Sequence, residues 1–193
     1  MPVGAGQRRQ VTIFFADCRG FSALAEKLPP EELVRLANRY FGACMPILLR
    51  HDGCIDKLLG DGIMAVFGAP IVRPDHVAQA VEAAFEVQRE MERLAAASRT
   101  RELVEVGIAI HTGEAIVGNV GTAEVMDFTA FGDVVNVASR LQALAAPGEV
   151  LVTEQVRRAL PSDEKWEGPR SVTLRGRHEP VSVYSRRIGK RSA

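Results

Sequence analysis

Cysteine is scarce in this chain of 193 residues, and the three that occur, Cys18, Cys44 and Cys54, form no C-x-x-C pair. Their number and spacing argue against a disulfide scaffold or a zinc site built on paired cysteines, and they favour a reducing, cytoplasmic compartment. Net charge is also absent, because 24 Lys and Arg balance 24 Asp and Glu, so no overall field attracts nucleic acid or an anionic membrane. No apolar run approaches the roughly 18 residues of a membrane span, and residues 1–10 lack the apolar stretch of a signal peptide. We therefore expect no nucleic-acid partner and no membrane contact by this chain.

Apolar residues are plentiful, at 47% of the chain against 25% charged residues. This balance is typical of a globular protein with a real core and excludes a disordered chain. No repeat and no long linker divides the sequence. We expect one folded domain over residues 11–188, with a lead-in at 1–10 and a tail at 189–193.

The periodicity of apolar residues predicts an α+β domain, built on a mainly antiparallel sheet with helices packed on one face. Gly60-Asp61-Gly62 separates two short apolar runs, as in a β-hairpin. The glycine-rich stretch Gly113–Gly121 lies between predicted strands, so it is not a dinucleotide-binding fingerprint. The predicted strands are Val11–Asp17, Cys54–Leu59, Ile63–Phe67, Leu103–His111, Ala115–Val120, Leu151–Thr153 and a terminal hairpin of Ser171–Arg175 with Val181–Tyr184. The predicted helices are Glu31–Asp52, a segment after Pro74, Asp133–Leu144 and Glu154–Leu160.

Two acids stand where predicted strands end: Asp17 closes the first strand, and Asp61 lies at the tip between the next two. Paired carboxylates at loop positions are a common way to hold two Mg²⁺ ions for an in-line phosphoryl displacement. The segment Cys18–Ser22 follows Asp17. Its backbone N–H groups around Gly20, with the Ser22 hydroxyl, form a candidate phosphate cradle. The competing interpretation is that both acids only cap backbone amides in turns.

A second set of polar residues falls on one predicted helix. Asn136 and Arg140 share a face of that helix, where an amide and a guanidinium could orient a ribose and stabilise charge on phosphorus. A solvated helix face is the alternative. Asp133 stands at the start of the helix, and we expect it to cap the helix rather than to catalyse. Lys57 precedes Asp61 on the same predicted strand and would share its face of the sheet, although a lysine alone is usually a surface residue.

Five stretches, in this order along the chain, resemble the class III nucleotidyl cyclase catalytic domain, and in particular the bacterial adenylate cyclases. They are VTIFFADCRGFSALAE (Val11–Glu26), DKLLGDGIMAVFGAP (Asp56–Pro70), IHTGEAIVGNVG (Ile110–Gly121), DFTAFGDVVNVASRLQ (Asp127–Gln142) and LRGRHEPVSVY (Leu174–Tyr184). The resemblance implies a ferredoxin-like βαββαβ core with a C-terminal hairpin extension. It also implies a head-to-tail homodimer in which each active site is shared between two subunits.

The same resemblance implies a role for individual residues. The metal-binding set would hold two Mg²⁺ or Mn²⁺ ions per active site, and the other residues would contact ATP or stabilise the transition state. The implied metal residues are Asp17, Asp61 and, through its backbone carbonyl, Cys18. The implied substrate-binding residues are Lys57, Thr129, Arg175, Arg19, Gly20, Phe21 and Ser22, and the implied catalytic pair is Asn136 and Arg140.

The choice of purine follows from hydrogen-bonding chemistry. Adenine presents an acceptor at N1 and a donor at N6, whereas guanine reverses both. Lys57 can only donate and Thr129 can accept through its hydroxyl, so the pair complements adenine. The alternatives are a guanylate cyclase and a catalytically silent homologue that binds nucleotide and regulates something else. Thr at position 129 marks a subgroup that includes bicarbonate-responsive members, so the resemblance leaves a bicarbonate response open.

Overall fold

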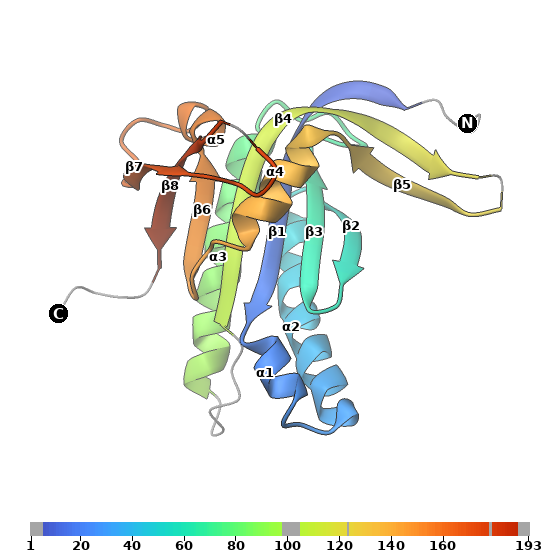
Figure 1. Cartoon of the computed structure of the whole chain (residues 1–193), viewed down its shortest axis with the longest axis vertical. Helices are drawn as coiled ribbons and strands as arrows, with labels where there is room; N and C mark the ends of the chain where they lie inside the picture. Colours follow the sequence, from blue (N-terminus) through green and yellow to red (C-terminus); the bar gives the residue numbers. More distant parts are fainter. Residues whose placement is uncertain (1–5, 98–104, 123, 178, 189–193) are drawn as a thin grey trace.

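A computed structural model describes residues 6–97, 105–122, 124–177 and 179–188 of the chain. Within these residues the chain forms an eight-stranded sheet in the order β2-β3-β1-β4-β6-β8-β7, with β5 paired to β4 (Figure 1). Neighbouring strands run antiparallel except β4 and β6, which are parallel. The strands are β1 (Gln7–Arg19), β2 (Cys54–Leu59), β3 (Gly62–Phe67), β4 (Glu105–Gly121), β5 (Met126–Phe131), β6 (Glu149–Thr153), β7 (Glu167–Val172) and β8 (Val181–Arg187). The helices are α1 (Phe21–Ala25), α2 (Pro30–Arg50), α3 (His76–Ala97), α4 (Asp133–Gln142) and α5 (Glu154–Arg158).

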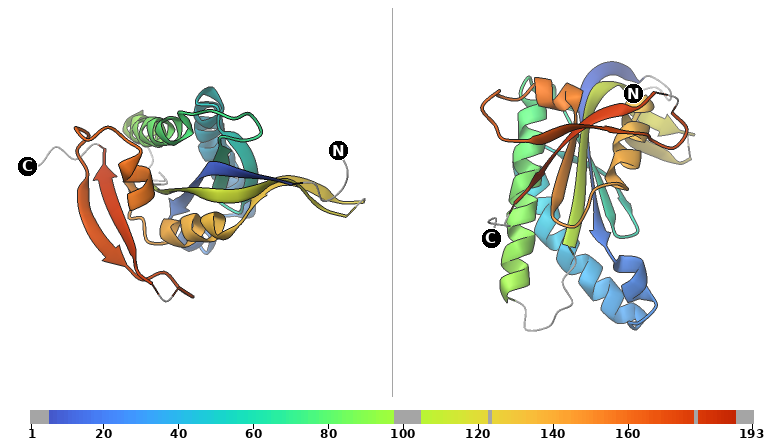
Figure 2. Two further views of the ribbon diagram at one scale, coloured as in Figure 1. Left: turned by 90° about the horizontal axis from the view of Figure 1, so that it is seen from above. Right: turned by 60° about the vertical axis from the view of Figure 1, so that its left-hand side comes forward.

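Both faces of the sheet are covered by an apolar layer. Side chains of the central strand β1 point alternately into the two layers, as successive residues of a strand do. Phe14 and Cys18 face the layer that α2 and α3 complete. Ile13 and Phe15 face the opposite layer, which contains Val134 of α4. The α+β class and the mainly antiparallel sheet are thus as predicted. The long helices α2 and α3 share one face, but α4 lies on the other, as the view from above shows (Figure 2).

The strand β4 is longer than the sequence indicated. Two strands, Leu103–His111 and Ala115–Val120, were expected with a break near Gly113. The described part is one strand from Glu105 to Gly121, since Gly113 stays in register with Val11 of β1. Leu103 lies outside the described residues.

The strand β5 was not predicted. It returns along the second half of β4, with Thr129 opposite Gly118, and the two strands form an arm that projects from the sheet (Figure 1). Its sequence, MDFTAF, alternates apolar and polar residues from Met126 to Ala130, so a strand signal was present but was not used. Pairing with β4 extends this short segment into the arm.

Near the two ends of the domain, the strands begin and end at other residues than predicted. β1 begins at Gln7, within the stretch expected as a lead-in, and residues 1–5 and 189–193 lie outside the described residues. The terminal hairpin forms as predicted, but its first strand ends at Val172, which pairs with Val181. Arg175 therefore lies in the loop between β7 and β8. Within the described residues, no helix has both the length and the apolar character that crossing a membrane requires.

Candidate active site

The two acids singled out in the sequence meet at one end of the sheet. Asp17 of β1 is in register with Gly62, the first residue of β3. Asp61 occupies the turn just before Gly62, so its carboxyl group comes close to that of Asp17 and the two interact. The Asp17 carboxylate lies close over β3, because a Cβ added to Gly62 would stand 3.8 Å from its Oδ1. The hairpin register thus brings together two residues that are far apart in the sequence.

The pair carries more negative charge than its surroundings neutralise. Partial burial of Asp61, its hydrogen bond to Asp17 and the negative charge of Asp17 raise the pKa of Asp61 to about 6. A divalent cation would relieve this repulsion. Among the described residues no third His, Cys, Asp or Glu joins the pair. Two carboxylates suit Mg²⁺ or Mn²⁺, which complete their coordination with water and substrate phosphates. The residues present therefore fit a divalent metal.

The residues that follow Asp17 divide between core and loop. The Cys18 thiol is buried under α2, where burial and the nearby Asp61 raise its pKa, so it stays protonated and only its backbone carbonyl is available to a metal. Gly20 adopts φ 79° and turns the chain into α1. The first N–H groups of that helix have no acceptor within it, and Ser22 is exposed. This loop keeps the backbone features expected of a phosphate cradle.

The Arg19 side chain leaves this loop. It crosses the backbone of Gly107, where an added Cβ would clash with the guanidinium, and it donates to the backbone carbonyl of Gln142. The guanidinium therefore binds the end of α4, a position that favours positive charge. Only the backbone of Arg19 remains to contact a substrate.

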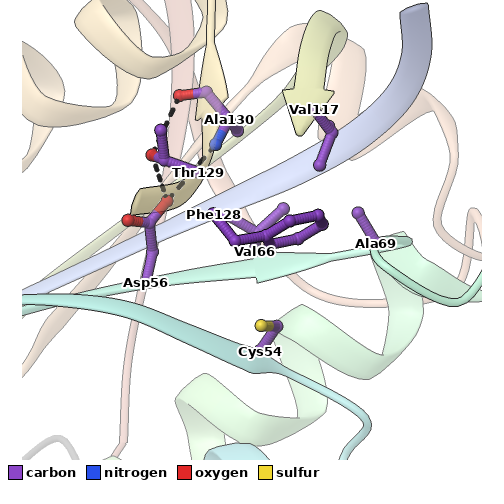
Figure 3. A pocket seen from close by; sticks show the side chains of 8 residues that line it. All are labelled: Cys54, Asp56, Val66, Ala69, Val117, Phe128, Thr129 and Ala130. Carbon is purple, nitrogen blue, oxygen red and sulfur yellow. Dashed lines mark hydrogen bonds between the residues drawn. The ribbon is translucent and has the colours of Figure 1, made fainter. Parts of the chain in front are cut away.

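The two residues expected to read a purine lie side by side, joined by a residue that the sequence did not single out. Asp56 accepts a hydrogen bond from the Thr129 hydroxyl at 2.6 Å (Figure 3). It also forms an ion pair with the Lys57 ammonium at 2.8 Å. Lys57 also donates to Asp127 at 2.5 Å. Although partial burial lowers the pKa of Lys57, the hydrogen bonds to Asp127 and Asp56 outweigh it and raise that pKa. The ammonium is therefore charged.

A β-bulge explains how neighbours on one strand can point to the same place. Ile55 pairs with Ala65 and Lys57 with Met64, so Asp56 is an extra residue in β2. A bulge of this kind re-aims side chains and is common beside active sites. The expectation that Lys57 and Asp61 share one strand is wrong, because β2 ends at Leu59 and Asp61 belongs to the turn. A signal was present: Asp56 is an acid within a run that was identified as apolar.

The predicted catalytic pair lies on α4 beneath the β7–β8 loop. Asn136 is exposed on this helix. The Arg140 guanidinium lies against Gly176 of the loop, where an added Cβ would stand 3.6 Å from Nη1. Arg175 precedes Gly176 and is exposed, so the loop brings it to the same region as Arg140.

Asp133 does not cap its helix as expected. The N-cap position belongs to Gly132, and the Asp133 carboxylate accepts a hydrogen bond from Arg177 of the β7–β8 loop instead. Two charged groups distant in sequence thus fasten this loop to the start of α4. Local capping rules could not reveal a partner that only the fold brings near.

Comparison with known sequences identifies the family. A family model described as "Adenylate and Guanylate cyclase catalytic domain" matches residues 3–185. The chain belongs to this family. An adenylate cyclase of Anabaena cylindrica is 33% identical over 188 residues, which are 94% of this chain and 38% of that protein. Adenylate cyclase 1 of Rhizobium meliloti is 37% identical over 142 residues, 72% of this chain and 21% of that protein. The chain thus spans well under half the length of these curated relatives.

Solved structures agree with the family assignment. The adenylyl cyclase CyaB from P. aeruginosa matches with a TM-score of 0.89 and 31% identity, covering 97% of this chain and 98% of that one. The guanylyl cyclase Cya2 matches with a TM-score of 0.86 and 32% identity, covering 93% and 92%. The fold is therefore that of a cyclase catalytic domain, as the sequence motifs predicted.

Within this cyclase domain the candidate residues form separate groups. Asp17 and Asp61 lie at the end of β1 beside α1, at the opposite end of the sheet from the β4–β5 arm (Figure 1). Lys57 and Thr129 are joined through Asp56. Among the described residues, no hydrogen bond or ion pair joins the acids to either Lys57 or Arg140.

Proposed function

We propose that this chain is an adenylate cyclase domain, which converts ATP into 3′,5′-cyclic AMP and pyrophosphate. The observation that carries the choice of ATP is the joining of Lys57 and Thr129 through one carboxylate, at 2.8 Å and 2.6 Å. A donor and an acceptor held side by side complement N1 and N6 of adenine, whereas guanine would leave both unpaired. A site built to hydrogen-bond one edge rejects the wrong base strongly.

The proposed reaction is an in-line displacement at phosphorus. The ribose 3′-hydroxyl gives up its proton to water or to an aspartate, and its oxygen bonds to the α-phosphorus. The bond from that phosphorus to the bridging oxygen breaks, and pyrophosphate leaves with the electron pair. Asp17, Asp61 and the Cys18 carbonyl would hold two Mg²⁺ or Mn²⁺ ions. When bound, such ions lower the pKa of the ribose hydroxyl and offset phosphate charge.

The other residues act on ribose and phosphate. Arg140 would neutralise the negative charge that grows on the phosphoryl oxygens, and Asn136 would orient the ribose. Arg175, exposed in the neighbouring loop, would bind a phosphate, as would the backbone N–H groups of Gly20, Phe21 and Ser22.

We further propose that the working unit is a head-to-tail homodimer. The carboxylate pair of one subunit would face Lys57, Thr129, Asn136 and Arg140 of the other. This arrangement is supported by the grouping of the described residues, in which Asp17 contacts Asp61 while Lys57 and Thr129 contact Asp56. It creates two composite sites, and a single subunit has none. A bicarbonate response belongs to the same proposal, and the rate measured against bicarbonate at fixed pH tests it.

Product identification tests the proposed activity. The purified chain is incubated with Mn²⁺ and either ATP or GTP, and the products are separated by chromatography. We expect cyclic AMP and pyrophosphate from ATP, with far less product from GTP. Cyclic GMP as the main product would replace the proposal with a guanylate cyclase, and no cyclic product from either nucleotide would favour a silent homologue.

A further inference from the structure

The carboxylate of Asp56 is the least exposed charged group beside the proposed purine contacts. Its side chain is 1% exposed, and it lies beside a hollow of about 10 Å³ lined partly by Val66, Val117 and Phe128 (Figure 3). That volume holds at most one water molecule and no purine. A base therefore has to approach from outside, where it meets Lys57 and Thr129 but not Asp56.

Oδ2 of this carboxylate accepts two hydrogen bonds, whereas Oδ1 has an ion-pair contact and no hydrogen bond. The Thr129 hydroxyl lies 2.6 Å from Oδ2, the Ala130 backbone N–H donates to the same oxygen at 3.3 Å, and the Lys57 ammonium lies 2.8 Å from Oδ1. A carboxylate in this setting only accepts, so the Thr129 hydroxyl has to donate its single proton to it. The Ala130 carbonyl, at 3.4 Å, is a longer and uncharged alternative acceptor within the same subunit.

This use of the proton changes what Thr129 can offer to a base. A free hydroxyl can rotate and either donate or accept, so it would tolerate the O6 acceptor of guanine as well as the N6 donor of adenine. Once its proton is bonded to Asp56, Thr129 presents only lone pairs. Those lone pairs accept from an exocyclic amino group and are repelled by a carbonyl oxygen.

We propose that Asp56 is a specificity-determining positioning residue, which makes Thr129 an acceptor and thereby selects adenine over guanine without touching the base. The inference rests on the proposed adenylate cyclase function and adds to it the residue that sets the polarity of the purine contact. The bulge at Asp56 serves this purpose, because it turns an acid and its neighbouring lysine toward the same place.

The test is a double-mutant cycle with Asp56→Ala and Thr129→Val, read out as the ratio of kcat/KM for ATP to that for GTP. We expect Asp56→Ala to lower this ratio by about tenfold or more in the wild-type background. We expect it to leave the ratio unchanged in the Thr129→Val background, where no hydroxyl remains to orient. A role confined to folding would lower kcat/KM for both nucleotides alike in both backgrounds, and that result would overturn the inference.

Asp127→Asn is the matched control, since Asp127 contacts the Lys57 ammonium but not Thr129. It should keep the ATP to GTP ratio within about threefold of the wild type. A fall as large as that of Asp56→Ala would place the effect in Lys57 and contradict the role of Thr129. Asp56→Leu keeps the branched shape of the side chain without its oxygens, and it is used if the alanine variant has a lowered melting temperature.

A binding measurement separates this inference from the proposed function. 3′-Deoxy-ATP and 3′-deoxy-GTP lack the attacking hydroxyl, so their affinities with Mg²⁺ can be compared by calorimetry without turnover. Asp56→Ala should narrow the difference between the two dissociation constants. If the wild type forms no cyclic AMP, the proposed function fails. If it forms cyclic AMP and Asp56→Ala leaves both the ratio and the affinities unchanged, only the inference fails.

Discussion

Asp61 is expected to destabilise the metal-free protein at neutral pH, so that Asp61→Asn raises its stability. The folded protein raises the pKa of Asp61 from 3.8 to about 6. A change of that size corresponds to about 3 kcal/mol for a fully buried group. Because Asp61 is only half-buried, solvent screening reduces the expected effect to about 1 kcal/mol. That gain should raise the melting temperature by about 2–4 °C for a chain of this length.

The sign of the pH dependence follows from linkage. Between pH 3.8 and about 6 the folded protein binds a proton at Asp61 that the unfolded chain has released. The contribution of Asp61 to stability is therefore present below pH 3.8 and is lost as the pH rises through about 6. The advantage of Asp61→Asn should be complete at pH 7 and should disappear as the pH falls toward 4.

Thermal unfolding followed by circular dichroism in EDTA, at several pH values, measures this advantage. Added Mn²⁺ should raise the melting temperature of the wild type more than that of Asp61→Asn, because only the wild type keeps both carboxylates. Asp163→Asn makes the same change in charge at an exposed acid and should show neither effect. A less stable Asp61→Asn protein at pH 7, or a difference from the wild type that does not depend on pH, would refute the reasoning.

Three further predictions concern α4 and the loop above it. Arg140→Ala should lower kcat by about 10²–10³-fold with little change in KM for ATP, because the charge that Arg140 offsets develops in the transition state. If steady-state kinetics instead show KM rising by as large a factor, Arg140 acts in ground-state binding. Gly176→Val should lower both the melting temperature and kcat, because Gly176 has φ 74° and lies against Arg140; unchanged kcat would show that the loop does not position Arg140. Leu141→Ala, at a fully buried position, should cost about 2–5 kcal/mol in urea unfolding, and a cost below about 1 kcal/mol would contradict the packing of α4 on the sheet.

The hairpin that carries Asp61 could be predicted because its signals are local. Two short apolar runs around Gly60-Asp61-Gly62 mark the turn, and the nearly continuous apolar run Val11–Ala16 indicates a buried strand. Placing Asp17 opposite Gly62 needs the pairing of β1 with β3. The sequence supported that pairing only through the resemblance to the cyclase family.

Other features depend on contacts between distant segments. The chain enters α4 directly from β5, so the face of the sheet that α4 covers depends on where β5 lies. β5 in turn is held in place by pairing with β4. The partners of Asp133 and Arg19 are Arg177 and the Gln142 carbonyl, which no local rule connects to them. Asp56 was missed because a single acid next to Lys57 has no periodicity, although its place within an apolar strand was a usable signal.

The shared active site is tested most directly by mixing two inactive variants, Asp17→Ala and Arg140→Ala. A heterodimer of the two has one site that lacks both residues and one site that keeps both. Random pairing of equal amounts should therefore restore roughly a quarter of wild-type cyclic AMP formation. Each variant mixed with itself should remain inactive. If the mixture is no more active than either variant alone while heterodimers form, the two residues do not meet across a subunit interface, and the account of a composite site is wrong.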